Sequence, residues 1–105
     1  MKKIALIAAL AAASMTSVAY ASEAIVTKAG CMACHAKDKK VVGPGFNMVA
    51  EKYKGDAGAV AKLTEKVRKG GSGVWGPIPM PPNDVSKISD ADLKSAIEWI
   101  LKGAA

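Results

Sequence analysis

Histidine and cysteine, which supply strong nitrogen and sulfur ligands and covalent bridges, are scarce in this chain of 105 residues. It holds one histidine, His35, and two cysteines, Cys31 and Cys34. A metal site built from two histidines is therefore excluded. A disulfide that closes a long loop is excluded as well, because the two cysteines are separated by only two residues and such a short loop constrains the unfolded chain very little.

Aromatic side chains are also few, with one phenylalanine, two tyrosines and two tryptophans. A small domain with so few aromatic residues has a thin core, and domains of this size often need a disulfide, a metal or another group for stability. The net charge of +6 comes from 15 basic and nine acidic residues. Without a dense basic stripe interleaved with aromatic residues, this charge does not indicate nucleic-acid binding, but it favours docking to an acidic partner.

The chain lacks a long hydrophobic segment. Its apolar run at residues 4–13 is shorter than the roughly 20 residues that span a bilayer as a helix. Two lysines precede this run and Ala19-Tyr20-Ala21 follows it, as in a secretory signal peptide. We therefore expect residues 1–21 to be removed, the domain at residues 22–105 to be periplasmic, and no stable membrane insertion; a retained N-terminal anchor is the alternative.

The cysteines and the histidine stand together as Cys-x-x-Cys-His over residues 31–35. This pattern is typical of covalent c-type haem attachment. Residues three apart on a helical turn share a face, which suits two thioether bonds to one porphyrin edge, and the histidine is placed to reach the iron. Two alternatives are a Cys31–Cys34 disulfide, which export favours, and a dithiol oxidoreductase, whose usual βαβ context is missing here.

A haem at this motif needs a second axial ligand, and methionine is the natural candidate because no second histidine exists. Met32 lies inside the attachment motif and is too close to reach the other haem face. Met48 falls in a predicted helix and is explained more simply by packing. Met80 lies in a proline-rich segment, Ile78 to Asn83, that is stiff enough to hold a weak thioether ligand. We therefore predict His35 and Met80 as the iron ligands.

Apolar residues recur at three- and four-residue steps in several segments, which indicates helices. No segment alternates like a strand, and Ser72 to Asn83, rich in glycine and proline, is predicted to be an extended loop. We therefore expect an all-α domain. The four predicted helices run from a Ser22 cap to about Ala29, from Phe46 to Tyr53, from an Asp56 cap to Lys69, and from a Ser89 cap to a stop at Gly103.

Further motifs stand in order around the cysteine pair. They are Gly30-Cys31-Met32-Ala33-Cys34-His35, Val42-Gly43-Pro44, Arg68, and Gly73-Val74-Trp75-Gly76-Pro77-Ile78-Pro79-Met80-Pro81-Pro82-Asn83. Together they resemble the short bacterial class I cytochromes c of the c-551/552 kind, and the resemblance covers residues 22–105. It implies about four helices wrapped around one haem c, bound covalently through Cys31 and Cys34.

The resemblance also implies roles for residues around the haem. The carbonyl of Pro44 would accept the imidazole N–H of His35. Arg68 and Trp75 would hydrogen-bond a buried haem propionate, and Asn83 would donate to the sulfur of the methionine ligand. The alternatives are plain structural roles in a turn, at a helix end or in the core.

Ligation by His35 and Met80 fills both axial positions of the iron, and a thioether ligand raises the reduction potential. We therefore expect a soluble, monomeric one-electron carrier rather than an enzyme. The resemblance implies a membrane cytochrome complex as donor and a terminal oxidase or nitrite reductase as acceptor, and Lys37, Lys39 and Lys40 are candidates for guiding such partners. A haem sensor or peroxidase-like enzyme with a labile Met80 is the alternative.

Overall fold

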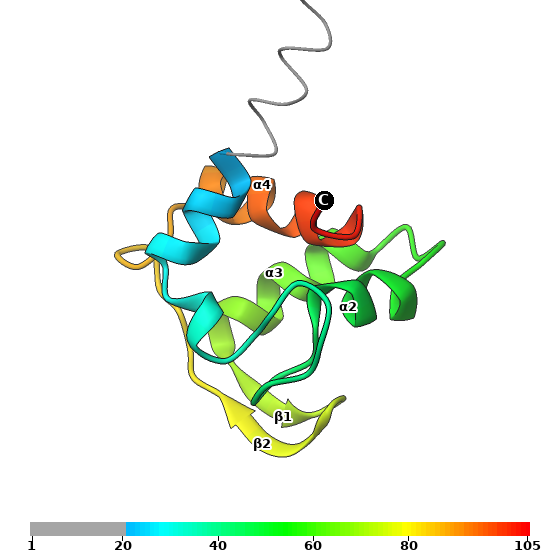
Figure 1. The fold of residues 1–105 in the computed structure, drawn as a ribbon. Helices are drawn as coiled ribbons and strands as arrows, with labels where there is room; N and C mark the ends of the chain where they lie inside the picture. The colour runs from blue at the N-terminus through cyan, green and yellow to red at the C-terminus, as the bar shows by residue number, and fades with distance from the viewer. Residues whose placement is uncertain (1–20) are drawn as a thin grey trace, which may run out of the picture.

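The computed structural model describes residues 21–105, so the predicted signal peptide lies outside the described residues except for its last residue. Within this range no helix is long and apolar enough to cross a membrane. The elements in order are a helix at residues 21–28, the 3-10 helix η1 (Cys31–Ala33), α2 (Phe46–Lys52), α3 (Ala59–Lys69), β1 (Gly71–Gly73), β2 (Gly76–Met80) and α4 (Asp90–Leu101) (Figure 1).

The helices enclose one small core beneath α4. Figure 1 shows α4 and the helix at residues 21–28 at one end of the molecule, the β1–β2 hairpin at the other, and α3 between them. Phe46 of α2 meets Trp99 of α4 edge-on, with ring centroids 5.8 Å apart. The buried residues of this core are Val26, Phe46, Ile88, Leu93, Ala96, Ile97, Trp99 and Ala104.

The start of α4 follows the sequence prediction. The hydroxyl oxygen of Ser89 accepts a hydrogen bond of 3.2 Å from the backbone N–H of Asp92, which satisfies one of the free donors at the helix start. Leu93 and Ile97, four residues apart, then lie on the buried face. The predicted capping residue and apolar stripe of this helix are both confirmed.

Two other predicted helix starts are wrong. Residue 21 is already helical, so Ser22 lies inside the first helix, where it is almost fully buried. The carboxylate of Asp56 accepts a 2.8 Å hydrogen bond from the backbone N–H of Gly58, and α3 starts only at Ala59, with Gly58 in the capping position. The Asp56 side chain thus closes a local turn before the helix instead of capping it.

Part of the predicted loop forms a β-hairpin. Strands β1 and β2 pair antiparallel, with Gly71 opposite Met80 and Gly73 opposite Gly76. These glycines include three with φ between 114° and 117°, a region that other residues rarely enter. Alternating hydrophobicity could not reveal strands so rich in glycine and proline, so the expectation of no strands is wrong for residues 71–80. The helices still carry the core, as expected for an all-α domain.

Candidate functional site

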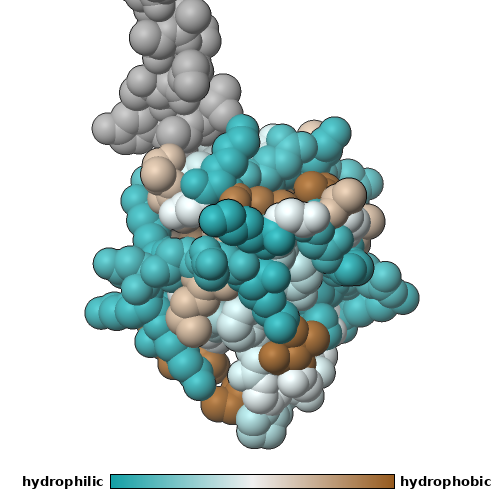
Figure 2. Space-filling model, turned by 90° about the vertical axis from the view of Figure 1, so that its right-hand side faces the viewer, coloured by the Kyte–Doolittle hydropathy of each residue, from teal (hydrophilic) through white to brown (hydrophobic). Residues whose placement is uncertain are grey.

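A large cavity separates the helical core from the hairpin and holds about 1170 Å³ of empty space, part of it open to solvent. Figure 2 shows hydrophobic residues around a hollow at the lower end of one face, while hydrophilic side chains cover most of the rest. Within residues 21–105, every helix except the one at residues 21–28 contributes to its wall. The apolar helix residues in this wall are Phe46, Val49, Leu63, Val67, Ile97 and Ile100.

The potential ligands predicted from the sequence all line this cavity: Cys31, Cys34, His35 and Met80. The first three come from η1 and the residues after it, and Met80 comes from the end of β2. The fold therefore brings an imidazole, a thioether and two thiols from segments far apart in sequence to one apolar cavity. This donor set fits a c-type haem.

The cysteine motif forms a tight helical turn. The backbone N–H groups of Cys34 and His35 both donate to the carbonyl of Cys31, at 3.2 and 3.0 Å. Both thiols are free, and burial raises the pKa of the Cys31 thiol. Catalytic dithiols instead need a lowered pKa to supply the thiolate, so the structure gives no support to a disulfide or to dithiol redox chemistry.

The imidazole of His35 is held on two sides. Its Nδ1 lies 2.8 Å from the carbonyl oxygen of Pro44, the contact that the resemblance implied. With a proton on Nδ1 donated to Pro44, the lone pair of Nε2 is free for a metal. Phe46 stacks on the ring, at 5.4 Å between centroids and 22° between planes. A Cβ at Gly43 would overlap with this imidazole, so only glycine fits there.

The segment after Met80 is tied to the end of α3. The backbone N–H of Asn83 donates to the carbonyl of Val67 at 3.0 Å. The Asn83 amide nitrogen donates to Pro81 at 3.0 Å and more weakly to Val67 at 3.4 Å. In the described part of the chain these donors therefore go to carbonyl oxygens, and a bond to the Met80 sulfur, the predicted role, is not among them.

Arg68 lies elsewhere than the prediction implied. It does not line the cavity, and its guanidinium donates to groups in the segment between β2 and α4. The basic residue of α3 that lines the cavity is Lys66. Helical periodicity could have indicated Lys66, because it follows the cavity residue Leu63 by three positions and so shares its helix face, whereas Arg68 follows Leu63 by five. Sequence reasoning missed Lys66.

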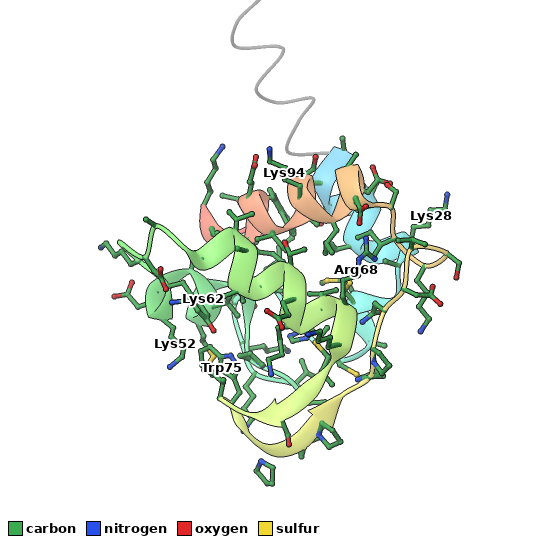
Figure 3. All side chains as sticks on the ribbon, turned by 180° about the vertical axis from the view of Figure 1, so that it is seen from behind. Lys28, Lys52, Lys62, Arg68, Trp75 and Lys94 are labelled. Carbon is green, nitrogen blue, oxygen red and sulfur yellow. The ribbon has the colours of Figure 1, made fainter. Side chains whose placement is uncertain are left out.

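Trp75 lines the cavity and lies in the turn between β1 and β2. The ammonium of Lys52, in α2, lies 5.4 Å from its ring centroid, within cation–π range. Figure 3 shows these two side chains together at one corner of the molecule. The contact links α2 to the hairpin.

The three lysines after the cysteine motif are not equivalent. Lys40 lines the cavity. Lys37 instead forms a 2.8 Å ion pair with Glu23 of the first helix and lies 6.0 Å from the ring centroid of Trp99. Lys39 is exposed to solvent. Of the three, Lys40 is therefore the best placed to meet a partner at the cavity.

A family model described as cytochrome c matches residues 20–104. The chain belongs to the cytochrome c family. It is 53% identical over 78 residues to cytochrome c2 of Rubrivivax gelatinosus, covering 74% of this chain and 92% of the relative. It is 46% identical over 101 residues to cytochrome c-552 of Hydrogenobacter thermophilus, covering 96% and 97%.

A solved structure shares the fold. Wild-type cytochrome c552 of Nitrosomonas europaea superposes with a TM-score of 0.71 at 44% identity, over 77% of this chain and 98% of that one. This cytochrome c is thus an all-α, class I domain that carries covalently bound haem c. Like its small cytochrome relatives, it is an electron-transfer protein and not an enzyme. The haem supplies an iron that gains and loses one electron.

Proposed function

We propose that this cytochrome c is a periplasmic one-electron carrier with a closed haem site, ligated by His35 and Met80 and bound through Cys31 and Cys34. The observation that carries the proposal is that His35 and Met80, from distant segments, line one apolar cavity. A site with both axial positions filled leaves no place for substrate or dioxygen, and a thioether ligand favours the reduced state.

The surrounding residues have distinct tasks in this proposal. Pro44 keeps the proton on Nδ1 of His35 and so fixes the ring orientation. Lys66 and Trp75, both in the cavity wall, take the haem propionates. Lys66 replaces Arg68 in this role because the donors of Arg68 go to groups outside the cavity. Asn83 holds the ligand segment through backbone carbonyls.

A preformed site of this kind changes little between oxidation states, which suits electron transfer at the haem edge. Lys40 and the exposed side chains Val42 and Ile78 border the cavity and provide a mixed basic and apolar rim for docking. Membrane cytochrome complexes as donors, and terminal oxidases or nitrite reductases as acceptors, are the partners we propose for the monomeric protein. The signal-peptide pattern at residues 1–21 supports export to the periplasm.

Carbon monoxide added to the purified, reduced protein at neutral pH tests the closed site. We expect an absorption spectrum that hardly changes, because Met80 occupies the position that carbon monoxide would take. Rapid and complete binding would instead favour the sensor or peroxidase-like alternative. The mass of the same sample should exceed that of the polypeptide by one haem, and a mass without haem would refute the attachment at Cys31 and Cys34.

A further inference from the structure

The guanidinium of Arg68 connects the end of α3 to the segment between β2 and α4. Its Nη1 donates to the carbonyl of Ile88 at 2.7 Å and to the carbonyl of Asn83 at 3.3 Å. Its Nη2 forms a 2.6 Å ion pair with Asp90 at the start of α4. Figure 3 shows Arg68 in the space between α3 and this segment. One side chain thus binds the segment at both ends.

The contacts of the Arg68 guanidinium differ in strength because their partners differ in exposure to solvent. The Arg68 side chain is only 19% exposed, whereas that of Asp90 is 86% exposed. An ion pair with so exposed a carboxylate contributes little. The bonds to the two carbonyls are charge-assisted, and removal of the guanidinium leaves part-buried acceptors without a donor. Most of the effect of Arg68 is therefore expected through Asn83 and Ile88.

The anchored end lies close to the proposed iron ligand. Asn83 follows Met80 with only Pro81 and Pro82 between them. Each proline ring locks the φ angle of its residue and restricts the residue before it. A stiff connection of this kind passes a displacement of Asn83 on to Met80 instead of absorbing it. The Val67 carbonyl, in the same helix as Arg68, holds the Asn83 backbone N–H at 3.0 Å and provides the second anchor.

We propose that Arg68 is a positioning residue that keeps Met80 on the iron by clamping residues 83–90 to the end of α3. The inference rests on the proposed ligation by His35 and Met80. A thioether is a weak ligand, so its residence on the iron depends on how firmly the surrounding chain holds it. Loss of the clamp leaves the haem attached through the cysteines and shortens the residence time of the Met80 sulfur.

The residence time is measured on the intact, oxidised holoprotein with imidazole as the competing ligand. At saturating imidazole, the decay of the near-infrared sulfur-to-iron band reaches a limiting rate set by dissociation of Met80. We expect Arg68→Gln to raise this limiting rate about tenfold, as for the loss of one charge-assisted hydrogen bond. Asp90→Asn, which keeps both carbonyl contacts, should change it less than about twofold.

The control is Lys69→Gln at the neighbouring position. It removes the same charge, but Lys69 pairs with Glu65 on the exposed face of α3, so its limiting rate should equal that of the wild type. Arg68→Lys, whose single ammonium cannot satisfy all three acceptors, should fall between wild type and Arg68→Gln. If Arg68→Gln fails to fold, Arg68→Lys carries the test, and a wild-type rate for that variant overturns the proposal.

A purely structural role for Arg68 gives a different result. In that case Arg68→Gln would lower the thermal midpoint but leave the limiting rate equal to that of Lys69→Gln, which overturns the inference. A separate result tests the proposed function. Absence of the sulfur-to-iron band in the wild-type protein would show that Met80 is not an iron ligand. A normal wild-type band together with unchanged Arg68 variants refutes the clamp alone.

Discussion

At the scale of single residues, the site depends on a close approach between the backbone and the imidazole ligand. Gly43 lies against the flat face of His35, and a side chain at this position has no space. The next residue, Pro44, provides the carbonyl that orients the ring. Gly43 therefore limits the space available to the imidazole, and Pro44 accepts a hydrogen bond from it.

Gly43→Ala tests the close contact between Gly43 and the imidazole of His35. The added methyl overlaps with the imidazole, so either the ring or the backbone must shift, and such overpacking typically costs about 1–3 kcal/mol. We expect a lower thermal midpoint and a changed haem spectrum. Gly58→Ala is the matched control, because a Cβ there meets its neighbours only at 3.4 Å or more. Equal behaviour of the two variants would show that Gly43 does not restrain His35.

Met80→Ala tests the second ligand. Removal of the thioether opens the sixth position, so the reduced protein should bind carbon monoxide. The reduction potential should fall by an appreciable part of the roughly 0.8 V range over which axial ligands set haem potentials. Met48→Ala is the control, since its sulfur accepts a hydrogen bond from Gly45 and lies outside the cavity wall. An unchanged potential in Met80→Ala would assign the ligand to another residue.

At the scale of elements, α4 is the helix on which the others pack. It lies against α2 and α3, and its residues Leu93, Ala96, Ile97 and Trp99 are buried. Ile97 also reaches the cavity wall. The stability of this one helix therefore affects both the core and the cavity.

Ser89→Ala removes the cap of α4 and leaves the Asp92 N–H without its acceptor. We expect a loss of about 1 kcal/mol in the free energy of unfolding, measured by denaturant titration of the holoprotein. Ser89→Thr is the control, because its hydroxyl accepts the same hydrogen bond and should preserve most of the stability. A loss as large in Ser89→Thr as in Ser89→Ala would argue against capping as the cause.

At the scale of the whole molecule, apolar residues of α2, α3 and α4 line the haem cavity as well as packing against one another. Among residues 21–105, the aromatic residues of the buried core are Phe46 and Trp99. Leu63, Val67 and Ile100 face the cavity and so depend on its contents for burial. The haem is therefore part of the core as well as the redox centre.

Haem-free protein should consequently be largely unfolded at room temperature. The attached haem fills the cavity in the folded state, and its removal exposes the apolar cavity wall to water. We expect weak helical circular dichroism and no cooperative thermal transition in a Cys31→Ala, Cys34→Ala double variant purified without haem. A cooperative melt with native-like helical content would contradict this.

Local signals were sufficient for part of this structure. The Ser89 cap, the apolar stripe of α4 and the turn of the cysteine motif depend on residues within one or two helical turns, so the sequence predicted them. The predictions of helix caps at Ser22 and Asp56 were wrong, because serine and aspartate also occur inside a helix and in turns. The hairpin was not predicted because its strands are rich in glycine and proline and show no alternating pattern of apolar and polar residues.

By itself, the sequence determined which groups are available: one imidazole next to two thiols, a methionine between prolines, and four helical stretches. It also carried enough of the cytochrome c pattern to indicate haem attachment. Helical periodicity relates Lys66 to Leu63, but only the tertiary structure decided that this face of α3 lines the cavity and that Arg68 donates to the segment after Met80. The reason is physical, because the direction of a long basic side chain depends on the acceptors that folding brings within its reach.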